Sequence, residues 1–114
     1  MSAITTHVLD TSRGRPAGGV PVSLEFRAGE REWELIGRGE TDADGRLRDL
    51  LAPGHVLRVG VYRLSFETEA YFSAQQIESF YPRVLVVFAV NDATEHYHVP
   101  LLLNPYGYST YRGS

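Results

Sequence analysis

The chain has 114 residues, a formal net charge of −3 and no cysteine. This length predicts one domain spanning residues 1–114. The slight acidic excess argues against a nucleic-acid-binding or anionic-membrane surface. The lack of cysteine excludes a disulfide scaffold, a thiol nucleophile and a thiolate metal site.

No segment approaches the ~20 apolar residues that a bilayer-spanning helix requires. The longest apolar run, Val84–Val90, has the length of a strand. The first residues contain no basic stretch followed by an apolar core, which a secretory signal would need. We therefore expect a soluble cytoplasmic protein.

Alternating apolar and polar residues with frequent turn residues predict strands through the first half of the chain. The first predicted strand covers residues 5–9 and ends before Gly14. Residues 20–28 carry apolar side chains at even positions, and residues 32–37 form the next strand. A polar turn follows at residues 41–46, in which Gly45 suits a positive φ.

The second half of the chain repeats this pattern with one interruption. Strands are predicted at residues 56–66, 84–90, 95–103 and 106–111, and a short helix in the first half of residues 67–80. The whole pattern indicates an all-β protein, a two-sheet antiparallel β-sandwich of about eight strands with one short helix.

Histidines offer the clearest candidates for chemistry. His96 and His98 point to the same face of a strand, because strand side chains repeat every two residues. His7 lies on the side of Thr5 and Leu9, and it would face His98 if the first and last strands met. The alternatives are acid–base catalysis, a zinc site formed by His7, His96 and His98, or structural imidazoles with no function. His55 lies in a turn and is left aside.

Arginine and tyrosine supply two further candidates. The Arg46 guanidinium suits a carbonyl or an oxyanion, although a solvated loop charge is the ordinary role of such a residue. The tail at residues 106–114 keeps a strand-like alternation and carries three tyrosines. A tyrosine stacks on planar rings and donates a hydrogen bond, but an edge strand with half-buried tyrosines also explains the pattern.

Four separated motifs identify a family resemblance. They are THVLDT at residues 6–11 with GRPA at 14–17, TDADGR at 41–46, HYHVPLLL at 96–103, and YRGS at 111–114. In this order they resemble the transthyretin-like family over nearly the whole chain. The final YRGS is similar to the tetrapeptide of the enzyme branch, which hydrolyses 5-hydroxyisourate, whereas the hormone carriers lack it.

The resemblance implies an eight-stranded β-sandwich that assembles as a homotetramer, with active sites at subunit interfaces and no metal or organic cofactor. It implies catalytic roles for His7, Arg46 and His98, and substrate binding by His7, Arg46 and Tyr111. The roles of His96 and of the terminal carboxylate, and the choice of general base, stay open. A non-catalytic small-molecule carrier with the same fold is the alternative function, since one fold hosts many functions.

Overall fold

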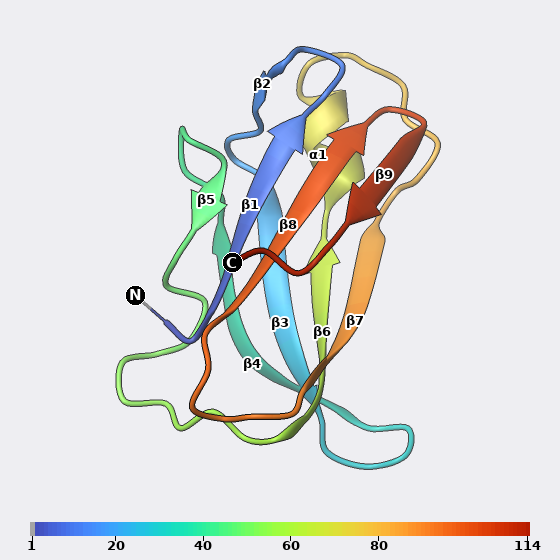
Figure 1. Cartoon of the computed structure of the whole chain (residues 1–114). Coiled ribbons are helices and arrows are strands. Elements are labelled where there is room, and N and C mark those ends of the chain that lie inside the picture. The colour runs from blue at the N-terminus through green and yellow to red at the C-terminus, as the bar shows by residue number, and fades with distance from the viewer. Residues whose placement is uncertain (1) are drawn as a thin grey trace.

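A computed structural model describes residues 2–114 and shows two β-sheets packed face to face (Figure 1). One sheet has the order β2-β1-β8-β9 with β5 also paired to β1, and the other has the order β4-β3-β6-β7. The elements are β1 (Ile4–Asp10), β2 (Arg15–Pro16), β3 (Pro21–Arg27), β4 (Trp33–Glu40), β5 (Arg46–Leu47), β6 (Gly60–Phe66), helix α1 (Thr68–Ser73), β7 (Val84–Val90), β8 (Tyr97–Asn104) and β9 (Gly107–Thr110). The prediction of an all-β sandwich with one short helix is confirmed.

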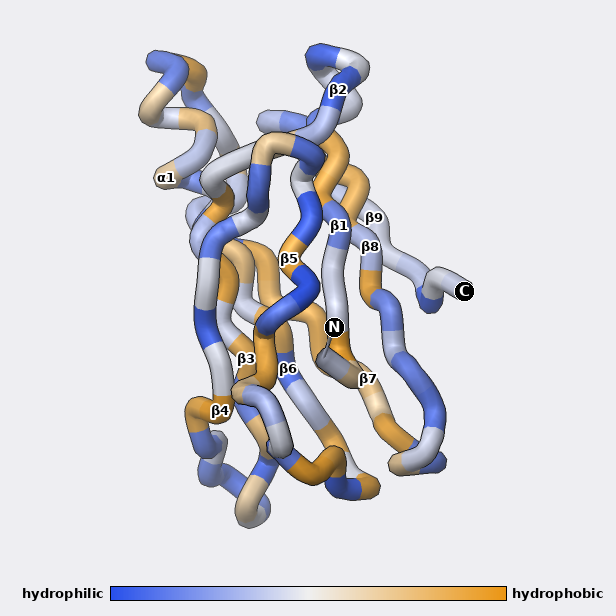
Figure 2. Tube along the Cα trace, turned by 90° about the vertical axis from the view of Figure 1, so that its left-hand side faces the viewer, coloured by the Kyte–Doolittle hydropathy of each residue, from blue (hydrophilic) through white to orange (hydrophobic). Residues whose placement is uncertain are grey.

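The alternation of side chains along the strands builds the core between the sheets. On β3, Val22 and Leu24 are buried, whereas Ser23 between them faces outward, because successive strand residues point to opposite faces. Figure 2 shows hydrophobic and hydrophilic positions following one another along the strands. Within residues 2–114, no helix is long and apolar enough to cross a membrane.

One pairing departs from the expected antiparallel arrangement. β1 and β8 run parallel, with Thr5 opposite His98 and His7 opposite Pro100, whereas the other strand pairs of the described chain are antiparallel. The early and late parts of the chain therefore lie side by side in the middle of one sheet (Figure 1).

The largest excess in a predicted strand lies at the start of β6. β6 begins at Gly60 and not at residue 56. The cause is local, because the Tyr62 hydroxyl bonds both the N–H and the carbonyl of Arg58, at 3.0 and 2.7 Å. These two backbone groups are therefore engaged by a side chain instead of a neighbouring strand.

The polar turn at residues 41–46 leads directly into β5, a short strand that the sequence did not predict. One carboxylate oxygen of Asp42 accepts hydrogen bonds from the N–H groups of Asp44 and Arg46, at 2.8 and 3.0 Å. Gly45 has a φ of 76°, and its carbonyl accepts a 2.7 Å hydrogen bond from the N–H of Val8. This turn places Arg46 opposite His7 on β1.

Gly45→Ala is expected to destabilise the protein by about 1–3 kcal/mol, because a non-glycine residue at positive φ is strained. A Cβ at this position would also lie 2.3 Å from the Val8 carbonyl oxygen. Urea unfolding measures the loss. Gly14→Ala is the matched control, since Gly14 has a φ of 65° with open space around it. Equal losses in the two variants would contradict the clash at Gly45.

Candidate functional site

Several of the predicted site residues meet on the outer face of the sheet that contains β1 and β8. The two-residue repeat turns Thr5 and His7 of β1 to that face, away from the buried Ile4 and Val8. A hollow of about 320 Å³ opens there. The lining side chains come from β1, β5, β8 and the chain end, and they are Thr5, Thr6, Arg46, Arg48, His96, His98 and Ser114.

A threonine hydroxyl connects the two late histidines of this hollow. Thr5 Oγ1 lies 2.8 Å from His98 Nδ1 and 3.1 Å from His96 Nε2. The two imidazole rings are nearly parallel, with centroids 6.4 Å apart. His98 therefore has Nδ1 committed to Thr5, while its Nε2 forms no hydrogen bond within residues 2–114 and is available to a water or a ligand.

His7 is held by a backbone carbonyl at the border of the hollow. Its Nε2 lies 2.9 Å from the carbonyl oxygen of Asp44. Because a carbonyl only accepts, Nε2 must carry the proton, and Nδ1 of the neutral ring keeps its lone pair. His7 does not line the hollow itself, but it lies opposite Arg46 in the β1–β5 pair.

The surroundings favour the neutral form of both imidazoles. Partial burial is the main cause that lowers the pKa of His98, and the positive charges of His96, His7 and Arg46 lower it further. Partial burial and then Arg46 lower the pKa of His7 below its ordinary 6.5, against the smaller opposing effect of the Asp44 carbonyl. At neutral pH both rings can therefore accept a proton.

This arrangement predicts the titration of His7. In a proton NMR titration, the ring of His7 should titrate below pH 6.5, and Arg46→Gln should raise that pKa because a neighbouring positive charge is removed. Arg38→Gln on β4 of the other sheet is the control and should leave the titration unchanged. A native pKa at or above 6.5, or no response to Arg46→Gln, would contradict this account.

The structure separates Tyr111 from the other predicted site residues. Its side chain is 57% exposed and lines a different depression, together with Val87, Phe88 and Arg112. The tail nevertheless passes the hollow, because the N–H of Gly113 donates to the carbonyl of His98 at 2.8 Å. A single chain thus gathers Arg46 and His98 in the hollow with His7 at its border, but it does not bring its own Tyr111 there.

Sequence reasoning missed several groups of the hollow, namely Thr5, Thr6, Arg48 and the Asp44 carbonyl beside it. The signal for Thr5 was present, since it shares a strand face with His7. The proposed zinc set of His7, His96 and His98 is wrong as a geometry, because no three potential ligands within residues 2–114 gather in a metal-binding arrangement. His55 lies elsewhere, in a depression beside Leu51 and Pro53.

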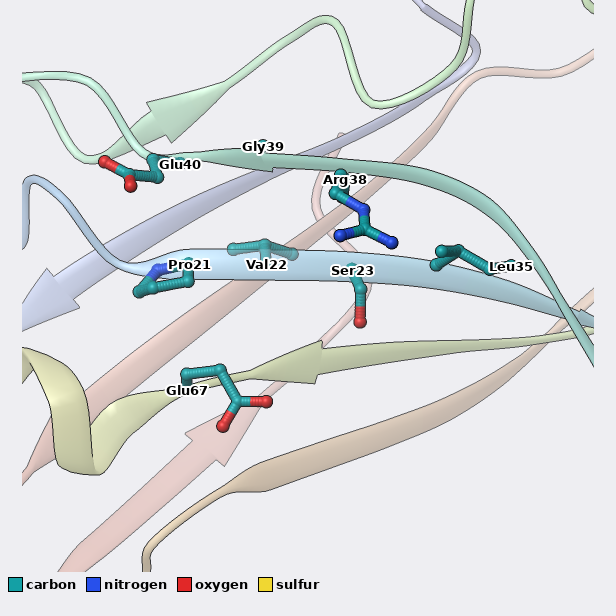
Figure 3. A pocket seen from close by; sticks show the side chains of 8 residues that line it. All are labelled: Pro21, Val22, Ser23, Leu35, Arg38, Gly39, Glu40 and Glu67. Atoms are coloured by element: carbon teal, nitrogen blue, oxygen red, sulfur yellow. The ribbon is translucent and has the colours of Figure 1, made fainter.

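A larger depression, of about 550 Å³, lies on the other sheet (Figure 3). Arg38, Ser23 and Glu67 are among its lining residues, and the Glu67 carboxylate forms a 2.9 Å ion pair with Arg83. No histidine lines it. The smaller hollow is therefore the candidate active site, because it combines two imidazoles with a guanidinium.

Two face-to-face sheets with one short helix, and a polar hollow on the outer face of one sheet, define a β-sandwich protein of the transthyretin type. The HIUase/Transthyretin family matches residues 4–113, and the chain belongs to this family. The resemblance seen in the sequence motifs is thereby confirmed.

Relatives and solved structures support this assignment. The chain is 51% identical over 113 residues to a probable 5-hydroxyisourate hydrolase of Caenorhabditis elegans, covering 99% of this chain and 82% of that protein. The structure of Klebsiella pneumoniae 5-hydroxyisourate hydrolase superposes with a TM-score of 0.86 at 39% identity, covering 100% of both chains. Sea bream transthyretin in complex with thyroxine gives a TM-score of 0.90 at 32% identity, covering 98% of this chain and 95% of that one.

Proposed function

We propose that this protein is a cytoplasmic enzyme that hydrolyses 5-hydroxyisourate, opening its six-membered ring at a ring amide during the degradation of urate to allantoin. The observation that carries the proposal is the hollow itself, which is lined by His98 and Arg46 and bordered by His7. Within the described part of the chain, Nε2 of His98 forms no hydrogen bond. The full-length similarity to 5-hydroxyisourate hydrolases supports the same substrate.

The imidazoles accept and donate the protons that the reaction moves. Water oxygen bonds to the ring carbonyl carbon while an imidazole nitrogen takes one of its protons. The ring C–N bond then breaks, and the leaving nitrogen receives that proton. His7 Nδ1 has a free lone pair, and His98 Nε2 has one when Nδ1 of that ring carries the proton. A positioned general base typically contributes about 100- to 10,000-fold to such a step.

Arg46 stabilises the negative charge that develops on the substrate during the reaction. When water attacks, the carbonyl oxygen gains negative charge, and the Arg46 guanidinium both orients the flat ring and stabilises that oxygen. A donor aimed at a developing oxyanion is typically worth about 3–4 kcal/mol of barrier. No metal or organic cofactor has a role in this scheme.

Assembly completes the site. We place the sites of a homotetramer where subunits meet, with a Tyr111 side chain bounding the pocket and holding the ring. The exposed side chains of Leu85 and Val87 on β7 and of Tyr108 on β9 support association. Both strands lie at sheet edges, where unpaired backbone groups favour pairing with another chain.

The decisive experiment follows the ultraviolet absorbance of freshly made 5-hydroxyisourate. Addition of the protein should accelerate its decay well beyond the spontaneous rate, in proportion to protein concentration and without added metal. Decay at the spontaneous rate would overturn the proposal. Saturable binding of a small ligand with no acceleration would instead identify a carrier of the transthyretin kind.

A further inference from the structure

A single buried hydroxyl joins the two imidazoles of the hollow. Thr5 is only 3% exposed, and the parallel register of β1 and β8 places it directly opposite His98. Its Oγ1 contacts His98 Nδ1 at 2.8 Å and His96 Nε2 at 3.1 Å. Both histidines line the hollow, and His96 is the more exposed of the two.

The Thr5 hydroxyl can arrange its two hydrogen bonds to the histidines in only two ways. A threonine hydroxyl has one proton, so it donates to one of the two ring nitrogens and accepts from the other. When it accepts from His98 Nδ1–H, neutral His98 has a bare Nε2 that can take a proton from water. When it donates to His98 Nδ1, the ring proton is on Nε2 and can be given away. The orientation of one hydroxyl therefore sets whether His98 acts as base or acid.

We infer that Thr5 is a positioning residue that links His98 to His96 as a proton relay in the hydrolysis of the proposed substrate. His98 Nε2 takes a proton from the attacking water, His98 Nδ1–H passes its proton to Thr5 Oγ1, and the Thr5 proton moves to His96 Nε2. His98 is then neutral with its proton on Nε2, and His96 is the imidazolium. Donation of the Nε2 proton to the leaving nitrogen reverses each transfer, so all three groups return to their starting state.

Electrostatics favours this displacement of charge. A cationic His98 would lie beside Arg46, with His7 and Arg48 also near the hollow. His96 is exposed to solvent, and the Arg112 guanidinium, which pairs with Glu95 at 3.4 Å, also donates to the His96 carbonyl at 3.4 Å. Moving the positive charge from His98 to His96 thus takes it from a partly buried position to a better-solvated one.

The variant Thr5→Val tests the relay, because valine keeps the shape of threonine and removes the hydroxyl. It should lower kcat about 10- to 100-fold, the loss expected for a hydrogen bond to a charged group, with little change in KM. Thr5→Ser should retain most of the native kcat. Thr68→Val is the control. Thr68, the first residue of α1, is also buried, but its hydroxyl donates to the carbonyl of Tyr81.

A double-mutant cycle tests the coupling itself. If Thr5 and His96 act as one unit, Thr5→Val/His96→Ala should be no slower than Thr5→Val alone. Nitrogen-15 NMR of the free protein adds a readout without substrate, because the ring-proton position of His98 should change in Thr5→Val and not in Thr5→Ser. Additive losses, a native kcat in Thr5→Val, or a Thr5→Ser variant as slow as Thr5→Val would overturn the relay. If the native protein itself fails to accelerate hydrolysis, the proposed function fails instead.

Discussion

Arg46→Gln is expected to reduce kcat/KM for 5-hydroxyisourate by about 100- to 1000-fold, the usual cost of removing one donor to an oxyanion. Glutamine keeps a polar side chain but lacks the positive charge and the planar fork of the guanidinium. In the proposed mechanism Arg46 acts on an oxygen that becomes charged only during the reaction, so most of the loss should appear in kcat. Initial rates of ultraviolet decay over a range of substrate concentrations measure both constants.

Arg38→Gln is the matched control for this variant. Arg38 lies on β4 of the other sheet and lines a depression without imidazoles. The activity of Arg38→Gln should equal that of the native protein. Both Arg38→Gln and Arg46→Gln should have melting temperatures near that of the native protein. An Arg46→Gln variant with a native melting temperature and a native kcat would remove the guanidinium from the proposed mechanism.

His98→Ala is expected to lower kcat by about 100- to 10,000-fold, the range for loss of a general acid–base group. The native rate should also fall in acid, with an apparent pKa below 6.5, because burial and nearby positive charges lower the pKa of His98. A base with a lowered pKa is active above that pKa and loses activity as the pH falls through it. Rate against pH, measured in both proteins, checks the two expectations together.

Added imidazole sharpens the test of His98. If the alanine variant only lacks a proton carrier, free imidazole should restore part of the rate as its concentration rises. His55→Gln is the control, because His55 lies in a separate depression. An alanine variant that folds normally and keeps most of the native rate would contradict the role of His98.

Much of the fold follows from local patterns. The apolar run at Val84–Val90 is β7 without any shift of its ends, and the alternation at residues 20–28 contains β3. The two-residue strands β2 and β5 were missed, because so short a segment has no measurable period. β5 depends instead on the hydrogen bonds around Asp42, which fix the backbone that follows the turn.

The candidate site could be predicted only in part. The sequence singled out His98 and Arg46, and the structure places both at one hollow. It could not show that Thr5 lies between two imidazoles, because that contact depends on the register of β1 against β8. The position of Tyr111 was equally inaccessible, since it depends on the path of the tail after β9. Local periodicity indicates which face a side chain occupies but not which strand lies next to it.

The parallel pairing of β1 with β8 also affects biosynthesis. The hydroxyl of Thr5 and the ring of His98 are separated by 93 positions along the chain. The ribosome must therefore release most of the polypeptide before these two groups can meet, and closing so large a loop slows folding. Nascent chains that stop before β8 should have no enzymatic activity. Turnover of the substrate would therefore report that synthesis has passed β8 and that β8 has paired with β1.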